Sequence, residues 1–455
     1  MDYIRDLEQA MSKDRVTTNE TIIEEHSFDE SHHTPSRPTV VVFPEHSEEV
    51  RKIVQIASQY EVPVIPYGAG SSLEGQVIPC DGGITVDFSL MNKILEVREQ
   101  DLLVKVEPGV TRLQLNKELK KYGLFFTVDP GADATLGGMA ATNASGTTSV
   151  KYGIMRDQVR DLEVVLADGS IIHTGNLAEK SSSGFHLNSF FVGSEGTLGL
   201  FTELTLKVHG IPEHKVAARA VFPSIEQAVS AVVSILHAGI PIARCELVDE
   251  SSVKHVNQYS DTNYMEAPTL FLEFHGNQSG LQEDVEFTKE LVKEQGCQEI
   301  IFETDSKAAH QLWESRHNLA YAFIHSYPGK KMILTDVSLP ISELTGAILY
   351  AQEEMKDMDM VGAILGHVGD GNFHTILMID KENKEEVEKA DLYNEKLVKY
   401  ALARGGTCTG EHGVGIGKKK YQRLEFGLAY DLMVKMKQTL DPKCILNPGK
   451  IVDRY

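Results

Sequence analysis

Hydrophobic and polar positions follow two different periods along the first half of the chain. Apolar runs such as TVVVF (39–43) and VPVIPY (62–67) are typical of buried strands. Between them, apolar residues recur at helical spacing from Val50 to Ala57, and Ser47 stands where a helix N-cap is expected. Later strand-like runs are separated by Gly- and Asp-rich turns rather than by regular helices. This half therefore predicts strands and helices around a mixed sheet.

The second half repeats one pattern three times: an apolar run, a helical pattern and another apolar run. The first copy runs from VAARAVF through an amphipathic stretch (224–237) to IARCELVD. The second contains PTLFLEFHG, a charged helix (281–295) and QEIIFETD, and the third contains MILTDVSLP, a helix (342–356) and MVGAILGHV. Each copy predicts a strand–helix–strand unit. Three such units predict a second domain with a sheet backed by helices.

The chain has 455 residues, which is too long for one compact core and suits two or three domains. The HGIPEH stretch (209–214) lies between the two patterns and is a natural boundary. We therefore expect a first domain over residues 1–210, a second over 211–425, and a C-terminal segment over 426–455.

Charge and cysteine usage narrow the classes of partner. The chain has 44 Lys plus Arg against 66 Asp plus Glu, a net charge of −22, which repels phosphate backbones and anionic lipid. We therefore expect no nucleic acid partner. No stretch approaches the roughly 20 apolar residues of a membrane span, and MDYIRDLEQAMSKDRV has no apolar signal core. The five scattered cysteines, without a CxxC, indicate reduced thiols, so we expect a cytoplasmic protein.

A glycine-rich segment, PYGAGSSLEG (66–75), follows an apolar strand. Its backbone amides can point at an anion, with Ser71 and Ser72 as further donors. The segment fits neither GxGxxG, because Leu73 stands where the third glycine is required, nor GxxxxGK[ST]. A phosphate cradle and an ordinary glycine-rich turn both remain open for this segment alone.

Two further segments have the same character. DPGADATLGGMAATNASGTTSVKYG (129–153) and VGSEGTLGLFTEL (192–204) are rich in small residues, which allow a bulky ligand to approach the backbone closely. Cofactor sites are commonly assembled from several loops, so three such segments in one domain favour a ligand site over three unrelated turns.

The segment GHVGDGNFH places two histidines around a tight turn. Its flanks predict two strands joined by the turn GDGN, with Val368 opposite Phe373 and His367 opposite His374. Directly opposed side chains have Cβ atoms about 4.5–5.5 Å apart, so both imidazoles can share one metal ion. A histidine in a strand is otherwise a packed or surface residue, and that alternative stays open for the hairpin alone.

A third metal ligand is expected from CTGEHGVGIG (408–417). Glu411 stands in this loop beside His412, and the neighbouring glycines free the backbone. Two histidines and one carboxylate leave open positions on Zn, Mn or Fe, the arrangement of a site that also binds substrate. Asp370 and Asn372 are expected to shape the turn, with Asn372 also within reach of substrate.

The three small-residue segments, in this order, strongly resemble the FAD-binding domain of the vanillyl-alcohol oxidase/PCMH flavoprotein family. There, the first loop wraps the FAD pyrophosphate, the second lines the pyrophosphate and ribityl chain, and the third borders the cofactor deeper in the fold. The resemblance implies an α+β fold: a PCMH-type FAD-binding domain, an α/β cap domain with an antiparallel sheet backed by helices, and a C-terminal segment returning to the FAD domain. No histidine lies in the first two loops, so noncovalent FAD is expected.

The same resemblance carries a cofactor-binding role to matching positions of this chain. These are Pro66, Gly68, Ala69, Gly70, Ser71, Ser72, Gly75, Pro130, Gly131, Asp133, Thr135, Gly137, Gly138, Ala141, Asn143, Ser145, Gly146, Tyr152, Gly153, Glu195, Gly196, Leu198 and Asn447.

The second half resembles one branch of that family. LWESRHNLAYA (312–322), TDVSLPI (335–341), GHVGDGNFH, GTCTGEHGVGIGK and LDPKCILNPGK occur in this order in cytochrome-linked D-lactate dehydrogenases, with glycolate oxidase flavoprotein subunits and D-2-hydroxyglutarate dehydrogenases as relatives. The likeness implies oxidation of a small D-2-hydroxy acid, D-lactate first, to the 2-oxo acid. The hydroxyglutarate enzymes have a lysine just before the aspartate segment, whereas this chain has Leu334, so a short monocarboxylate fits better.

The resemblance also implies roles and partners. Arg316 would hold the substrate carboxylate, although a solvated helix arginine is the alternative from sequence alone. His412 would be the general base, with a fourth metal ligand as the alternative. Hydride passes to flavin N5 and electrons go on to a cytochrome, a quinone, an electron-transfer flavoprotein or an iron–sulfur subunit, rather than to NAD. The sequence is compatible with a homodimer.

Three other functions remain open at this point. One is a flavoprotein subunit that needs iron–sulfur partners, as in glycolate oxidase, and another is a D-2-hydroxyglutarate dehydrogenase. The third is a non-redox transfer, because alkyl-glycerone-phosphate synthases share the FAD-binding fold.

Overall fold

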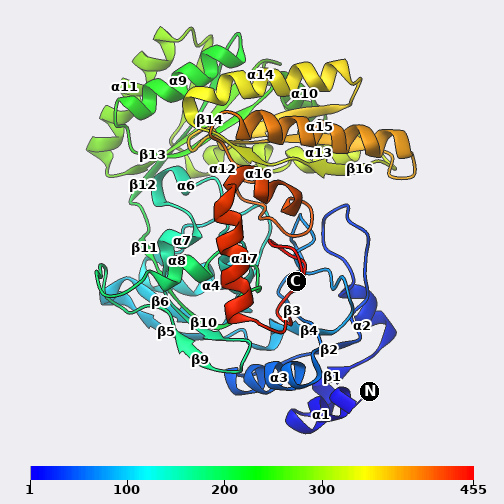
Figure 1. The fold of residues 1–455 in the computed structure, drawn as a ribbon. Helices are drawn as coiled ribbons and strands as arrows, with labels where there is room; N and C mark the ends of the chain where they lie inside the picture. Colours follow the sequence, from blue (N-terminus) through cyan, green and yellow to red (C-terminus); the bar gives the residue numbers. More distant parts are fainter. Residues whose placement is uncertain (1) are drawn as a thin grey trace. The chain divides into compact units, whose positions relative to one another are not determined.

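The computed structural model describes residues 2–455, which form two compact units (Figure 1). The first unit contains the chain up to Ser145, Gly153–Ile211 and Glu411–Tyr455, and the second contains Gly146–Tyr152 and Pro212–Gly410. We expected the C-terminal segment to begin at residue 426, whereas the chain leaves the second unit after Gly410. The short segment 146–152 also belongs to the second unit, inside the range expected for the first.

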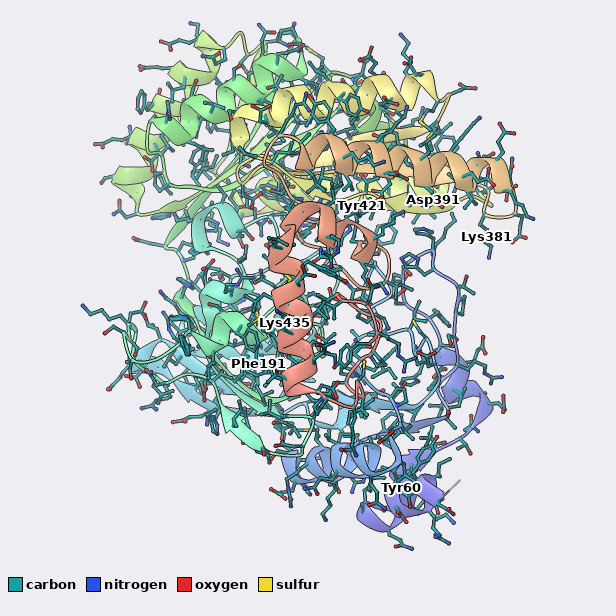
Figure 2. The ribbon with its side chains drawn as sticks, in the orientation of Figure 1. Tyr60, Phe191, Lys381, Asp391, Tyr421 and Lys435 are labelled. Carbon is teal, nitrogen blue, oxygen red and sulfur yellow. The ribbon has the colours of Figure 1, made fainter. Side chains whose placement is uncertain are left out.

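The first unit contains a small mixed sheet with the strand order β1-β2-β4-β3. Its strands are β1 (Val16–Thr17), β2 (Val40–Val42), β3 (Val64–Tyr67) and β4 (Ile84–Asp87), with β2, β4 and β3 parallel. Helix α3 (Ser47–Tyr60) has His46 at its N-cap, one residue before the predicted Ser47, because Ser47 is already helical. Helix α1 (Asp2–Ala10) packs on α3, and the Tyr60 hydroxyl donates to the Asp6 carboxylate at 2.7 Å (Figure 2).

A second sheet of this unit is entirely antiparallel, with the order β5-β6-β10-β8-β9. Its strands are β5 (Ile94–Arg98), β6 (Leu103–Val106), β8 (Val159–Val165), β9 (Ile171–His173) and β10 (Leu200–Lys207). A hydrophobic core packs on it and includes Phe191 (Figure 2). A two-stranded sheet pairs β7 (Leu124–Phe125) with β11 (His209–Gly210).

Short helices complete the first unit. They are α2 (Glu20–Glu25), α4 (Arg112–Leu119), α5 (Leu136–Thr142), α7 (Met155–Gln158), α8 (Leu187–Phe191), α16 (Gln422–Phe426) and α17 (Leu428–Leu440). After α17 the chain reaches β3, where the Val64 N–H donates to the Ile445 carbonyl at 2.7 Å. The buried Lys437 ammonium donates to the Asp441 carboxylate and to the Thr197 carbonyl. The predicted return of the C-terminal segment to the first domain is confirmed.

The second unit is built on one antiparallel sheet with the order β15-β12-β14-β13-β18-β19-β16, and β17 pairs with β19. The strands are β12 (His214–Val221), β13 (Ile242–Val248), β14 (Thr269–Gly276), β15 (Glu299–Glu303), β16 (Lys331–Leu334), β17 (Val337–Ser338), β18 (Gly362–Gly366) and β19 (Asn372–Ile379). The predicted α+β fold, with an antiparallel sheet in the second domain, is confirmed.

Helices cover both faces of this sheet (Figure 1). The three predicted helices are present as α9 (Ile225–His237), α11 (Gln278–Glu294) and α14 (Ile341–Asp357), which lie side by side on one face. The other face packs against α10 (Glu250–Ser260), α12 (Ser306–His317) and α13 (Leu319–Ser326). Two further helices of this unit are α15 (Lys384–Leu402) and the short α6 (Ser149–Tyr152).

Candidate metal and substrate-binding site

Two of the predicted cofactor loops meet at Gly68 and Thr135 in the first unit. A Cβ at Gly68 would lie 2.3 Å from the Thr135 hydroxyl oxygen, so only glycine fits there. That oxygen also caps helix α5 by accepting from the Gly138 N–H at 3.3 Å. A Cβ at Gly137 would lie 2.6 Å from Pro108, and Gly70 has a φ of +67°. The small residues are therefore required by the packing of the two loops.

These loops fit a pyrophosphate-bearing cofactor such as FAD. The Gly68–Gly70 loop follows the parallel strand β3 and packs against Thr135, the N-cap residue of α5. The N–H groups of residues 136–138 donate to the carbonyls of Val110 and Pro108 and to the Thr135 hydroxyl, so at this helix end an anion is favoured by the helix dipole. Gly68 and Gly137 let the two loops pack closely against Thr135 and Pro108, which keeps the backbone of both loops compact.

Several predicted cofactor residues use their side chains to hold the loops. The Asp133 carboxylate accepts from the Leu113 N–H at 3.0 Å, and the Ser72 hydroxyl donates to Asp29 at 2.9 Å. The Asn143 side chain, at a φ of +54°, accepts from the Arg156 N–H at 3.0 Å. Their contacts with FAD stay predictions.

The other cofactor positions divide between the units. Gly146 and Tyr152 belong to the second unit, where the Tyr152 hydroxyl lies 2.8 Å from His275 Nδ1. The first unit contains Pro66, Ala69, Ser71, Gly75, Pro130, Gly131, Ala141, Ser145, Gly153, Gly196 and Leu198.

Glu195 and Asn447 tie the C-terminal segment to the third loop. The Glu195 carboxylate accepts from the N–H groups of Val414 at 2.6 Å and Gly415 at 2.8 Å, and from Gln76 at 3.3 Å. Burial raises the pKa of Glu195 to about 7, although these donors act in the opposite direction. The Asn447 amide donates to the carbonyls of Glu195 and Gln76. Both residues therefore hold the frame of the FAD domain together.

The histidine hairpin of the second unit has a register different from the predicted one. His374 pairs with Leu365, not with His367, and Val368 does not oppose Phe373. The His367 carbonyl instead accepts from the Asp370 N–H at 3.2 Å and the Asn372 N–H at 3.3 Å, so residues 367–371 form the loop. Gly371, with a φ of +84°, allows the chain to turn there. The predicted cross-strand pair is wrong, because the register is shifted by two residues and His367 lies in the loop.

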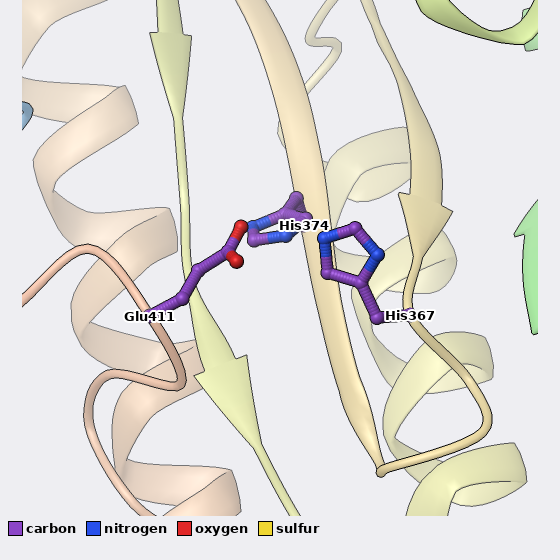
Figure 3. A group of neighbouring side chains, drawn as sticks. All are labelled: His367, His374 and Glu411. Carbon is purple, nitrogen blue, oxygen red and sulfur yellow. The ribbon is translucent and has the colours of Figure 1, made fainter. Parts of the chain in front are cut away.

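The two imidazoles nevertheless meet, and Glu411 joins them (Figure 3). Ring centroids of His367 and His374 are 5.4 Å apart, and one ligand atom from each of the three residues lies within 4.8 Å of the others. Glu411 directly follows Gly410, which packs against Asn372 of the hairpin. The Ser145 hydroxyl donates to the Glu411 carboxylate at 2.9 Å. The three residues predicted as metal ligands are thus neighbours.

Hydrogen bonds fix the orientation of both imidazole rings. His367 Nδ1 lies 2.6 Å from Glu246, and His374 Nδ1 lies 3.1 Å from the Thr335 carbonyl. A carbonyl and a carboxylate accept hydrogen bonds, so both Nδ1 atoms carry the proton and Nε2 is the atom that could coordinate a metal ion. Two imidazole nitrogens and one carboxylate fit Zn, Mn or Fe.

Glu246 was missed by the sequence reasoning. It lies on β13 with a fully buried side chain, and its second oxygen accepts from Arg316 Nη2 at 2.7 Å. Burial would raise the pKa of Glu246, but His367 and Arg316 together lower it. The only sequence signal was a charged residue within the apolar run IARCELVD. Arg316 itself is buried, so the alternative of a solvated helix arginine is wrong.

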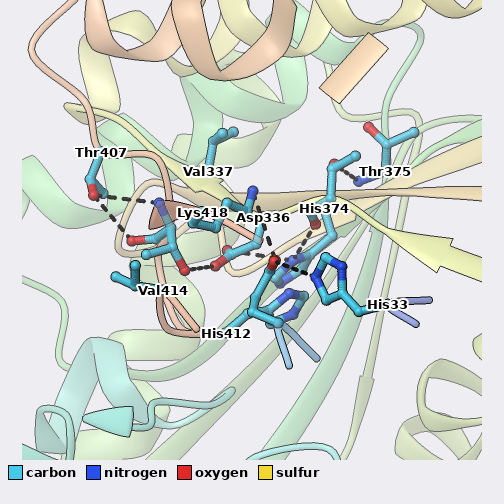
Figure 4. A network of polar contacts seen from close by, with 12 residues as sticks. His33, Asp336, Val337, His374, Thr375, Thr407, His412, Val414 and Lys418 are labelled. Carbon is cyan, nitrogen blue, oxygen red and sulfur yellow. Dashed lines mark hydrogen bonds and ion pairs between the residues drawn. The ribbon is translucent and has the colours of Figure 1, made fainter. Parts of the chain in front are cut away.

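A second buried carboxylate, Asp336, organises the other side of the hairpin (Figure 4). It accepts from the Asn372 amide at 2.7 Å and from the Thr409 hydroxyl at 2.6 Å, and it lies 3.7 Å from His374 Nδ1. The Asn372 carbonyl oxygen is buried and has no hydrogen-bond partner among residues 2–455. Asn372 can therefore accept one further hydrogen bond, and its contact with substrate stays a prediction.

His412, the predicted general base, is partly buried. Its backbone carbonyl accepts from the Gln76 amide at 2.7 Å, which anchors the residue next to Glu411. The role of its imidazole stays a prediction.

Comparison with known proteins identifies the family. Residues 38–175 match an FAD binding domain, and residues 211–451 match the C-terminal domain of FAD linked oxidases. The chain belongs to the FAD-linked oxidases. It is 44% identical to "Probable D-lactate dehydrogenase, mitochondrial" of Danio rerio, over 96% of this chain and 89% of that protein. It is 33% identical to "Glycolate oxidase subunit GlcD" of Bacillus subtilis, over 94% and 91%.

Solved structures agree on the fold. A p-cresol methylhydroxylase structure with substrate bound superposes with a TM-score of 0.84, covering 99% of this chain and 96% of that one, at 18% identity. This FAD-linked oxidase therefore has the PCMH-type fold, in the branch that includes D-lactate dehydrogenase (cytochrome) and the glycolate oxidase subunit. It is an FAD-linked oxidoreductase, as predicted.

The predicted cytoplasmic location is contradicted. The Danio rerio relative and three further D-lactate dehydrogenases are named as mitochondrial. Reduced thiols do not distinguish the cytoplasm from the interior of an organelle. Within residues 2–455, no helix of this FAD-linked oxidase has the length and hydropathy needed to span a bilayer.

Proposed function

We propose that this FAD-linked oxidase oxidises a small D-2-hydroxy acid, D-lactate first, to the 2-oxo acid, with a divalent metal ion bound by His367, His374 and Glu411. The observation that carries the proposal is the meeting of these three side chains in a relative of D-lactate dehydrogenases. The electrons pass on to an acceptor other than NAD, and a relative named "D-lactate dehydrogenase [cytochrome]" supports a protein acceptor.

Bound FAD supplies the acceptor for the hydride that leaves Cα of the hydroxy acid. A divalent ion supplies Lewis acidity that favours loss of the hydroxyl proton. Arg316 binds the substrate carboxylate, and its planar guanidinium restricts the orientation of Cα. His412 accepts the hydroxyl proton, and Asn372 accepts a hydrogen bond from the substrate through its unpartnered oxygen. Hydride and proton together account for conversion of the alcohol to the ketone.

The substrate class is supported by Leu334, which ends strand β16 directly before Thr335 and Asp336. An apolar side chain there cannot bind a second carboxylate. D-lactate and similar monocarboxylates are therefore better substrates than dicarboxylic hydroxy acids.

An anaerobic reduction experiment tests this proposal. D-lactate should bleach the flavin absorbance of the purified holoprotein, and L-lactate should not. Chelation of the metal should slow the reduction by D-lactate, and added Mn²⁺ or Zn²⁺ should restore it. An unchanged spectrum with D-lactate and metal present would overturn the proposed activity.

A second candidate is a flavoprotein subunit of a glycolate-oxidising complex, which is supported by the similarity to the Bacillus subtilis subunit. Such a subunit needs its partners for turnover. The two candidates are separated by measuring turnover of glycolate and of D-lactate by the isolated chain with an artificial dye acceptor. Efficient D-lactate turnover by the chain alone supports the first proposal.

A further inference from the structure

Glu246 links two residues that the proposed function uses for different purposes. One carboxylate oxygen lies 2.6 Å from Nδ1 of His367, and the other lies 2.7 Å from Nη2 of Arg316. The carboxylate has 0% exposure, and the Arg316 side chain has 9%. Strand β13 pairs Leu247 with Gly366, which places Glu246 beside the start of the histidine loop.

We propose that Glu246 is a positioning residue that fixes both the tautomer of His367 and the orientation of Arg316. One side chain then prepares a metal ligand and a carboxylate-binding group together. This inference rests on the proposed function and adds a residue that touches neither the metal nor the substrate.

The effect on His367 follows from donor and acceptor chemistry. An ionised carboxylate has no proton to donate, so Nδ1 of His367 must carry the hydrogen in this contact. The lone pair then lies on Nε2, where it can bind a metal ion. Carboxylates that accept from metal-binding histidines also make the ring a better ligand, and their loss typically lowers metal affinity about 10- to 100-fold.

The effect on Arg316 follows from the planarity of the guanidinium group. Once Nη2 is held by Glu246, the directions of the other N–H groups are fixed. The Nε atom of Arg316 is buried and has no hydrogen-bond partner among the described residues. Because neither bulk solvent nor another described residue holds Nε, the orientation of the guanidinium is fixed by the ion pair with Glu246.

Glu246→Gln tests the idea because it keeps the shape but changes the hydrogen bonding. Arg316 can only donate, so it takes the amide oxygen, and the NH₂ group faces Nδ1 of His367. That contact favours a proton on Nε2, the wrong tautomer for coordination. We expect Mn²⁺ affinity, measured from the EPR signal of unbound Mn²⁺, to fall about 10- to 100-fold. At saturating Mn²⁺, KM for D-lactate should rise more than kcat falls.

Glu273→Gln is a matched control on the neighbouring strand β14. Glu273 is also buried between a histidine and an arginine, with His275 Nε2 at 2.5 Å and Arg244 at 3.8 Å. The same substitution there removes a comparable buried charge without a contact to His367. Glu273→Gln should lower the melting temperature about as much as Glu246→Gln does, and its Mn²⁺ affinity should stay within about twofold of the wild-type value.

Two charge-neutral double variants decide the question if Glu246→Gln does not fold. Glu246→Gln/Arg316→Met lets the amide oxygen turn to His367, whereas Glu246→Met/Arg316→Met offers no acceptor. The first should bind Mn²⁺ about tenfold more tightly than the second. Equal affinities of the two, or wild-type Mn²⁺ affinity in folded Glu246→Gln, would overturn the role of Glu246. Failure of the wild-type protein to bind Mn²⁺ would instead overturn the proposed metal site.

Discussion

Gly410 packs so closely on Asn372 that a Cβ at Gly410 would lie 2.0 Å from the amide nitrogen of Asn372. The next residue is Glu411, so this contact fixes the backbone directly before the proposed third metal ligand. We expect Gly410→Ala to displace Glu411 and to lower Mn²⁺ affinity about tenfold, with a stability loss of about 1–3 kcal/mol. Mn²⁺ titration and thermal unfolding measure both quantities. Gly276→Ala, whose Cβ would make only ordinary contacts at 3.4 Å, is the control.

Histidine variants should separate metal binding from proton transfer. His374→Ala removes a metal ligand, so purified protein should lose its metal and its turnover while remaining yellow. His412→Ala should retain flavin and metal but lose turnover about 10²- to 10⁴-fold, the usual contribution of a general base. Metal analysis and flavin absorbance of both proteins, with His310→Ala as an exposed control, provide the test. A metal-free His374→Ala protein with full activity would contradict the metal site.

The close contact of Gly68 with Thr135 predicts loss of flavin on substitution. Gly68→Ala would place a methyl group 2.3 Å from the Thr135 oxygen, which must move and weaken the cap of α5. We expect the flavin content per chain to fall at least about tenfold, because both predicted cofactor loops shift together. Gly210→Ala, in the same unit with no atom within 4 Å of its Cβ, should retain its flavin. A fully yellow Gly68→Ala protein would argue against a cofactor at these loops.

Glu195 should make the stability of the first unit depend on pH. Its pKa is raised from 4.5 to about 7, so the folded state binds the proton more tightly than the unfolded state. The free energy of unfolding should therefore fall as pH rises from about 4.5 to 7, by about 3 kcal/mol from this group. Glu195→Gln cannot titrate, so its stability should fall less over the same range.

Urea unfolding at pH 5 and pH 8 measures this difference for the wild-type and variant proteins. The exposed Glu213→Gln protein controls for the loss of one carboxylate. Equal changes in stability for Glu195→Gln and wild type would show that Glu195 is ionised throughout.

Much of the fold could be predicted because hydrophobic periodicity reports directly on strands and helices. Helices α9, α11 and α14 have clear apolar faces, and all three were predicted between the correct strands. Helix α10 was missed, since its sequence ESSVKHVNQYS is mostly polar and only Val253, Val256 and a few smaller or polar residues are buried. Its position comes from packing on α13, which local sequence does not encode.

The candidate site was predicted in composition but not in register. His367, His374 and Glu411 could be chosen because their residue types and glycine-rich surroundings suit a metal ion. The hairpin register could not be predicted, because it depends on two backbone hydrogen bonds to the His367 carbonyl that hold this residue in the loop. Glu246 could not be chosen either, since a single acidic residue in a strand has no signature until its partners are placed in space.

The first unit is assembled from both ends of the chain. Its strand β3 donates a backbone hydrogen bond to the carbonyl of residue 445, and Lys437 donates to the carbonyl of Thr197. During translation, residues 212–410 are therefore synthesised before the C-terminal part of the first unit. A nascent chain stopped after Gly410 should already protect the amides of the large sheet from hydrogen exchange, while strand β3 still exchanges freely. Flavin capture, on this view, is among the last events of biosynthesis.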